Sequence, residues 1–380
     1  RDPRLSMALI LADHQSGEVL ASIGSPAYSE TRGQGFVDMT QALRSPGSTL
    51  KPLVYGLAFD RGLAHPETLI ADTPVAFGRY APQNFDRQFR GDVTVREALQ
   101  LSLNIPVVRL TEALGPAHLV AALERAGVAP GFAGEPGLAV SLGGLGVTLT
   151  EMVQLYGALA RGGQAVPLHW QAGLAAPEPA RLISAASAWQ VGHILSQLPP
   201  PPGAGRPGQV AYKTGTSYGN RDAWAVGWDG QHVAGVWIGR PDGTPVPGAF
   251  GGTWAAPLLF RALALARDGG GALPPPPAEV LMLGTADLPP ALQRFGAAPD
   301  AAPGLELLFP PEGARLRGGQ GIPVKLRGGV PPYTLLVDGA VALTGQRRPA
   351  FVAPDSGPGF ATLSVIDATG QGAQVGVELR

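Results

Sequence analysis

The chain of 380 residues is long enough for about two or three domains, each with its own core. Its hydrophobic content of 45% and charged content of 15% are typical of a folded globular protein and exclude a disordered chain. The net charge of −1 gives no electrostatic reason to expect a nucleic-acid or membrane-surface partner, and the lack of cysteine excludes disulfides and thiol catalysis.

The first segments predict a β-hairpin. An apolar run at residues 7–13 and a second strand-like run at 17–24 are joined by His14-Gln15-Ser16-Gly17, which supplies turn residues. Neither these nor any other apolar run approaches the about 20 residues that a membrane helix needs. Because the sequence starts at Arg1 without methionine, we expect it to be part of a longer protein.

Helical segments follow the hairpin. Helices are predicted from Ser48 to about Asp60, at residues 117–126 and at residues 184–198. Thr94 with Glu97 and Thr148 with Glu151 have the spacing of capping boxes, which predicts helices running toward residues 103 and 162.

The pattern then changes to strands, at residues 210–217, 223–228 and 233–238, with turn residues between them that favour antiparallel pairing. Strand, helix and again strand predicts an α+β domain whose sheet combines the first hairpin with the late strands. Prolines at 274–277 indicate a linker, and beyond about residue 303 short apolar runs broken by Gly, Pro and Asp predict an all-β sandwich.

Lysine occurs only at positions 51, 213 and 325, and Lys51 follows Ser48 by three residues, which puts both on one helix face. A serine near a helix N-terminus suits a nucleophile, and lysine can be its base when burial or nearby positive charge lowers its pKa. Arginine cannot, because its pKa stays above about 12. The alternative for Lys51 is a solvated helix residue.

The second lysine lies in Lys213-Thr214-Gly215-Thr216-Ser217. On a strand, Lys213, Gly215 and Ser217 share one face, and Thr214 and Thr216 share the other. The glycine leaves room for a ligand backbone, and lysine with threonine hydroxyls makes a carboxylate-binding group. The alternative is an edge strand protected by a lysine.

Between the two lysines lies Ser102-Leu103-Asn104, which is uninformative alone but could bring a hydroxyl and an amide to the same cleft from a helix end. In this order, Ser48-x-x-Lys51, Ser102-x-Asn104 and Lys213-Thr214-Gly215 resemble the three motifs of penicillin-binding proteins and serine β-lactamases. The segments RSPGSTLKPLVYGLAFDRGL, GDVTVREALQLSLNIPVVRL and KTGTSYGNRDAWAVGW resemble the transpeptidase domain of class A penicillin-binding proteins.

The resemblance implies a penicillin-binding-protein or serine β-lactamase-like α+β domain at residues 1–272. A Pro-rich linker at 273–302 and an immunoglobulin-like β-sandwich at 303–380 would follow. It implies a peptidoglycan DD-transpeptidase. Ser48 would attack the carbonyl of a D-Ala-D-Ala stem peptide, Lys51 would take its proton, Ser102 would relay a proton to the leaving amine, and Asn104 would hold the donor peptide's amide.

The resemblance implies that the strand at residues 213–217 binds the C-terminal end of the substrate peptide. Lys213, Thr214 and Thr216 would bind the terminal carboxylate, with Gly215 and Ser217 completing the substrate-binding strand. The backbone amides of Ser48 and Thr216 would form the oxyanion hole.

The implied partners are peptidoglycan stem peptides on lipid II-derived glycan strands, and β-lactams, which would acylate the same serine. For the terminal module the resemblance implies a bacterial α2-macroglobulin or a cell-wall protein. No cofactor and no metal is expected, since the six histidines show no metal spacing. The parent protein would be periplasmic, anchored in the inner membrane by an N-terminal helix and equipped with a glycosyltransferase domain, both outside this sequence.

Three rival interpretations stay open. An α/β-hydrolase is suggested by Gly215-Thr216-Ser217-Tyr218-Gly219, but such an elbow must run from strand into helix. A serine β-lactamase would share the motifs, yet no Glu-x-x-Leu-Asn segment stands between the second and third. A non-catalytic β-lactam sensor would keep the acylation machinery.

Overall fold

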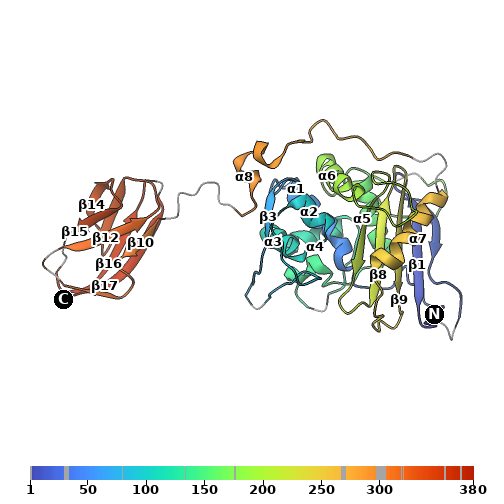
Figure 1. The fold of residues 1–380 in the computed structure, drawn as a ribbon, viewed down its shortest axis with the longest axis horizontal. Helices are drawn as coiled ribbons and strands as arrows, with labels where there is room; N and C mark the ends of the chain where they lie inside the picture. The colour runs from blue at the N-terminus through green and yellow to red at the C-terminus, as the bar shows by residue number, and fades with distance from the viewer. Residues whose placement is uncertain are drawn as a thin grey trace. The chain divides into compact units, whose positions relative to one another are not determined.

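The structure is a computed structural model that describes residues 2–29, 34–78, 80–132, 134–174, 177–266, 271–296, 305–317, 319, 321–354, 357–368 and 370–380. The chain divides into two compact units, Arg1–Gly296 and Ala297–Arg380 (Figure 1). No helix in the described ranges is long and apolar enough to cross a membrane.

The centre of the first unit is an antiparallel sheet. Its five described strands stand in the order β2-β1-β9-β8-β7, so β7 lies at an edge. Their bounds are β1 (Ser6–Asp13), β2 (Val19–Ile23), β7 (Ala211–Thr216), β8 (Asp222–Trp228) and β9 (His232–Gly239). The predicted union of the N-terminal hairpin with the late strands is confirmed.

Helices bury both faces of this sheet. Trp224 and Trp237 belong to the core shared with α5 (Leu149–Ala160), whereas Ala225 and Val236 belong to the core shared with α7 (Gly251–Ala266). Every residue of β8 is buried, because its alternate side chains all find an apolar layer. The sequence analysis did not anticipate α7.

The remaining helices gather beside the sheet, and both predicted capping boxes are present. The helix that begins after Thr94 ends at Gln100, earlier than predicted, and α3 was not anticipated. The elements are η1 (Gly47–Leu50), α1 (Lys51–Asp60), α2 (Val95–Gln100), α3 (Asn104–Leu114), α4 (Pro116–Arg125), η2 (Leu138–Leu142) and α6 (Ala185–Ser196).

Two small hairpins complete this unit: β3 (Leu69–Asp72) with β4 (Gly91–Thr94), and β5 (Gln164–Ala165) with β6 (Ala180–Arg181). The predicted linker is described up to residue 296. We call residues 271–296 the strap; it contains η3 (Thr285–Asp287) and α8 (Pro290–Gln293).

The strap is hydrogen-bonded to the rest of the first unit. Pro274 O accepts from Trp189 Nε1 at 3.0 Å, and the amide of Phe295 donates to Leu69 O at 2.8 Å. Arg294 extends the β3–β4 hairpin by a parallel bridge to Leu69. The strap therefore ends on the same hairpin that carries Asp72.

The second unit is all-β, as predicted. Its described strands form a sheet β10-β12-β15 and a sheet β11-β17-β16-β13-β14, with a separate apolar core. The strands are β10 (Glu306–Phe309), β11 (Ala314–Leu316), β12 (Ile322–Arg327), β13 (Tyr333–Val337), β14 (Ala340–Gln346), β15 (Ala350–Ala353), β16 (Gly359–Ile366) and β17 (Gly372–Leu379).

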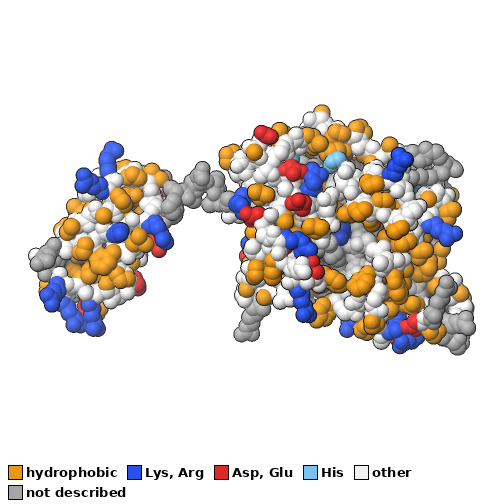
Figure 2. Space-filling model, viewed as in Figure 1, with side chains coloured by type: hydrophobic (Ala, Val, Ile, Leu, Met, Phe, Trp, Pro, Cys, Tyr) orange, Lys and Arg blue, Asp and Glu red, His pale blue; other side chains and the backbone are white. Residues whose placement is uncertain are grey.

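The face shown in Figure 2 carries basic and acidic side chains interspersed among apolar ones. Among the described residues no single-sign field dominates this face of the first unit, in keeping with the net charge of −1.

Candidate active site

Ser48 and Lys51 lie where a short 3₁₀ turn passes into a helix. Ser48 is in η1 and only partly buried, whereas Lys51, the first residue of α1, is fully buried. The amide of Lys51 donates to the carbonyl of Ser48, and Tyr156 Oη donates to Thr49 O at 2.7 Å. The turn is thus fixed by bonds to its backbone, with Ser48 facing outward.

Two glycines let this turn approach strand β7. A Cβ atom on Gly215 would lie 2.6 Å from Pro46 O, and one on Gly47 would lie 2.6 Å from Thr216 O. Gly47 also has φ +52°, in the left-handed region that favours glycine. The backbones of η1 and β7 therefore run so close at this point that only glycine fits at either position.

Gly215→Ala is expected to slow acylation of Ser48 by about a hundredfold, because the methyl group would push η1 away from β7 and misplace the nucleophile. The measurement is the second-order rate constant with a labelled penicillin. Gly252→Ala is the control, since a Cβ there meets nothing within 4 Å. Equal rates for the two variants would contradict this account of the close approach.

Ser102 owes its position to the way α2 ends. The amide of Ser102 donates to Leu99 O and that of Leu103 to Ala98 O, which is the Schellman pattern, with Ser102 at the left-handed position usually held by glycine. Its φ is +56°, uncommon for a residue with a side chain. Asn104 then begins α3. The helix junction turns the Ser-Leu-Asn segment toward Lys51.

The structure brings the first two motifs together at the ammonium of Lys51. Lys51 Nζ donates to Ser102 O at 2.6 Å, to Asn104 Oδ1 at 2.7 Å and to Leu103 O at 3.0 Å, and lies 3.5 Å from Ser102 Oγ. A neutral amine has two N–H donors and one lone pair. The three carbonyl acceptors match the three N–H groups of the ammonium; in the neutral form the bonds at 2.6 and 2.7 Å can use both donors, and the bond to Leu103 O at 3.0 Å is released.

The third motif, on strand β7, contacts the second motif through Lys213. Lys213 Nζ donates to Ser102 Oγ at 2.9 Å and to Thr214 O at 3.0 Å, and Lys213 is buried. The Ser102 hydroxyl therefore lies between two lysines, in reach of a proton from either.

Burial dominates the electrostatics of both lysines. It lowers the pKa of Lys51 well below its usual range; the nearby Lys213 charge lowers it further, and Asp72 opposes the shift. Burial lowers the pKa of Lys213 to about 8. Each ammonium charge disfavours the other, and the downward shift of the Lys51 pKa favours this lysine as the one that gives up its proton to act as a base.

The lowered pKa of Lys213 predicts that acylation slows at alkaline pH. The affinity for ligands with a carboxylate should fall as pH rises through about 8, because Lys213 loses its positive charge there. The rate constant of acylation by a penicillin, followed from pH 6 to pH 10, measures it. In Lys213→Arg the charge persists, so its alkaline limb should be absent; a limb at the same pH would assign the titration to another group.

The other predicted strand residues divide as expected between two faces. Thr216 Oγ1 accepts from the amide of Gly251, at the start of α7, at 3.3 Å. Ser217 is buried, and its hydroxyl donates to Asp222 Oδ2 at 2.7 Å and accepts from the Asp222 amide. The side chain of Ser217 therefore fixes the β7–β8 turn.

Two residues that the sequence analysis missed support this site. Asn84 Oδ1 accepts from the amide of Asn104 at 2.7 Å, and Asn84 Nδ2 donates to both oxygens of Asp72 at 2.8 and 2.9 Å. Both side chains are buried. In the sequence, Asp72 and Asn84 stand in a stretch interrupted by Gly and Pro, and nothing in that stretch indicates that the two side chains pair with each other.

Comparison with known families agrees with this geometry. Residues 7–257 match the family model "Penicillin binding protein transpeptidase domain". The chain belongs to this family. Residues 295–378 match "Penicillin-Binding Protein C-terminus Family", so the second unit is also of a type found in penicillin-binding proteins.

The similarity to class A proteins is confirmed by individual relatives. Penicillin-binding protein 1C of Escherichia coli (strain K12) is 44% identical over 263 residues, which cover 68% of this chain and 34% of that protein. Penicillin-binding protein 1B of Vibrio cholerae is 32% identical, covering 63% and 33%. The segment ALRSPGSTLKP and the terminal β module also resemble the 1C type, in agreement with the first of these relatives. The chain spans about a third of these relatives' length.

Solved structures show the same fold. Penicillin-binding protein 1A from Haemophilus influenzae aligns with a TM-score of 0.63 at 20% identity, covering 73% of this chain and 50% of that one. The PonA1 protein from Mycobacterium tuberculosis, solved in complex with penicillin V, aligns at 0.58 and 24% identity, covering 73% and 85%.

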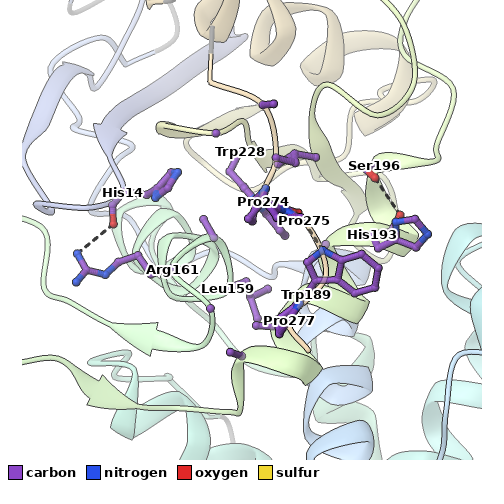
Figure 3. Close-up of a pocket in the computed structure, with 18 of the residues that line it drawn as sticks. His14, Leu159, Arg161, Trp189, His193, Ser196, Trp228, Pro274, Pro275 and Pro277 are labelled. Carbon is purple, nitrogen blue, oxygen red and sulfur yellow. Dashed lines mark hydrogen bonds between the residues drawn. The ribbon is translucent and has the colours of Figure 1, made fainter. Parts of the chain in front are cut away.

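A separate cavity of about 530 Å³ lies away from these motifs, between α5, α6, the β1–β2 turn and the strap. Figure 3 shows Trp189 stacked on His193 beside Pro274 and Pro275, with Arg161 donating to His14 O. The residues lining it include no member of the three motifs. Among the described residues no cluster of His, Asp and Glu could hold a metal ion.

Proposed function

We propose that this transpeptidase domain cross-links peptidoglycan stem peptides through an acyl-enzyme on Ser48. One observation carries the proposal. The fully buried Lys51 is bonded to the Ser102–Asn104 segment, and burial lowers its pKa well below the usual range of a lysine, as a general base requires. A solvated helix lysine would be neither buried nor so bonded.

Acylation follows from this arrangement. Ser48 Oγ attacks the carbonyl carbon between the two D-alanines while its proton passes to Lys51. The amides of Ser48 and Thr216 stabilise the oxyanion that forms. The C–N bond then breaks, and Ser102, bonded to Lys213 and close to Lys51, relays a proton to the amine of the departing D-alanine.

The second half-reaction uses the same groups in reverse. An amine from a neighbouring stem peptide attacks the ester, its proton returns through Lys51, and the peptide bond forms as Ser48 Oγ leaves. During acylation Lys213 and the Thr214–Thr216 strand hold the terminal carboxylate of the donor, and the Asn104 amide holds its backbone. Gly215 lets the strand lie close to η1, and Ser217 fixes the β7–β8 turn that follows it.

The wider role follows from the class A relatives. The parent protein would carry a glycosyltransferase domain and an N-terminal membrane anchor, act in the periplasm on lipid II-derived strands, and be inhibited by β-lactams. We divide the present chain into a transpeptidase domain, a connecting segment from residue 273 to 302, and a β module that binds a cell-wall protein or an α2-macroglobulin.

The decisive experiment is the intact-protein mass after incubation with a labelled penicillin. A single adduct that persists for many minutes and maps to the peptide containing Ser48 is expected, with none on Ser48→Ala. An equal adduct on that variant would remove Ser48 as nucleophile, and rapid hydrolysis of the adduct would favour a β-lactamase.

A sensor would also form the stable adduct. Release of D-alanine from a stem-peptide substrate, with transfer of the acyl group to an added D-amino acid, separates the two functions. Acylation by penicillin without any such transfer would leave the sensor function.

A further inference from the structure

The carboxylate of Asp72, at the end of β3, lies at the centre of a buried polar cluster. Asp72 is fully buried; it accepts two hydrogen bonds from Asn84 Nδ2 and one, at 2.9 Å, from the amide of Arg90. Asn84 Nδ2 also donates to Gln88 O at 2.7 Å. A buried charge needs such bonds, so the loop 83–90 is folded around this carboxylate.

The loop 83–90 is hydrogen-bonded to Asn104 at two points. Asn84 Oδ1 accepts from the Asn104 amide, and Gln83 O accepts from Asn104 Nδ2, each at 2.7 Å. These bonds leave Asn104 Oδ1 directed to Lys51 Nζ, also at 2.7 Å. Turning the Asn104 side-chain amide over would set its NH₂ group against Lys51 and its oxygen against Gln83 O, losing both bonds.

We propose that Asp72 and Asn84 are positioning residues of the acylation site, which hold Asn104 so that its oxygen accepts from Lys51. The inference rests on the proposed function and adds two residues to it. Neither side chain touches the reacting atoms; both hold Asn104 in place.

Asp72 has a second effect, through its charge. The charged groups that act on Lys51 are Asp72, from β3, and Lys213, from β7, and they oppose each other: Asp72 raises the pKa of Lys51 and Lys213 lowers it. Burial raises the pKa of Tyr55 on α1, and the Asp72 charge adds to that shift. The hydrogen bond to Asp86 raises the pKa of Arg90, with a smaller contribution from Asp72. Removing the negative charge should therefore lower the pKa of Lys51 further.

Two substitutions separate the effects. In Asp72→Asn the charge and one acceptor are lost, so the rate should fall about tenfold. The acid limb of the acylation profile should move about 0.5 to 1 pH unit lower, because Lys51 stays unprotonated to lower pH. In Asn84→Ala the charge remains, so the rate should fall about ten- to a hundredfold with the limb unmoved.

The measurement is the rate constant of acylation by a labelled penicillin from pH 5 to pH 9, on protein with a cooperative unfolding transition. Asp92→Asn is the matched control, because Asp92 lies on the same hairpin but pairs with Arg294 at the surface. It should leave both rate and limb unchanged. If Asp72→Asn does not fold, Asn84→Ala carries the test alone, since Asp72 keeps its bond from the Arg90 amide.

The inference would be overturned if both folded variants kept the wild-type acylation rate and the wild-type acid limb of the pH profile. It would also be overturned if the loss of acylation rate simply matched the fraction of unfolded protein. A wild-type protein that forms no adduct would instead overturn the proposed function, so the two failures are distinguishable.

Discussion

Replacing Lys51 with arginine is expected to slow acylation of Ser48 by about a hundred- to ten-thousandfold, the usual contribution of a general base. The guanidinium keeps its proton at every relevant pH, so it cannot accept one from Ser48. It is also wider than the fully buried space around the Lys51 ammonium. The measurement is the second-order rate constant with a labelled penicillin.

The chain supplies a matched control in its third lysine. Lys325 is exposed on β12 of the second unit, so Lys325→Arg should react as the wild type does. Lys51→Met removes the base with little change in volume and should be as slow as Lys51→Arg. Acylation of a folded Lys51→Arg within tenfold of the wild-type rate would show that Lys51 is not the base.

The three motifs were readable from the sequence because their chemistry needs particular residues at short spacings. Ser48 and Lys51 sit one turn apart, and a lysine in a chain that otherwise uses arginine marks a group that must lose its proton. The contacts of Lys51 and of Lys213 with Ser102 are tertiary, and only the resemblance to a family predicted them. The structure supplies the contacts, at 2.6 to 3.5 Å.

The missed elements lacked local signals. Helix α3 has no side-chain cap, because its N-cap residue is Leu103, which has no polar side chain. Asn104, its first residue, uses its amide group on Lys51 and Gln83 O. Helix α7 starts with two glycines and contains Pro257. Asp72 and Asn84 lie twelve positions apart, and their pairing depends on how the intervening loop folds. No propensity encodes such a contact.

The strap shows that composition alone does not predict whether a segment docks on the domain. Prolines predicted a linker because they lack an N–H group and break regular structure. Each nevertheless keeps a carbonyl, and Pro274 O accepts from Trp189. A Pro-rich segment can therefore dock through its acceptors, here against α6.

Shortening the chain at Ala272 rather than at Gly296 is expected to destabilise the first unit by about 2 to 4 kcal/mol. It removes buried or partly buried hydrogen bonds worth about 1 kcal/mol each. Those lost include Thr68 Oγ1 to Leu292 O at 2.6 Å, Thr285 Oγ1 to Glu67 O at 2.7 Å and the Phe295 amide to Leu69 O at 2.8 Å. Denaturant unfolding of the two shortened chains measures the difference.

Acylation should respond to the same cut, because the lost bonds hold the β3–β4 hairpin and that hairpin holds Asp72. Arg294→Ala in the full chain is the control: it removes only an exposed ion pair with Asp92 and should cost less than about 1 kcal/mol. If the two shortened chains had equal free energies of unfolding and equal acylation rates, residues 273–296 would add nothing to the stability of the first unit and would be only a linker. A loss confined to the chain ending at Ala272 would instead make the strap part of the catalytic domain, with the boundary to the β module after Gly296.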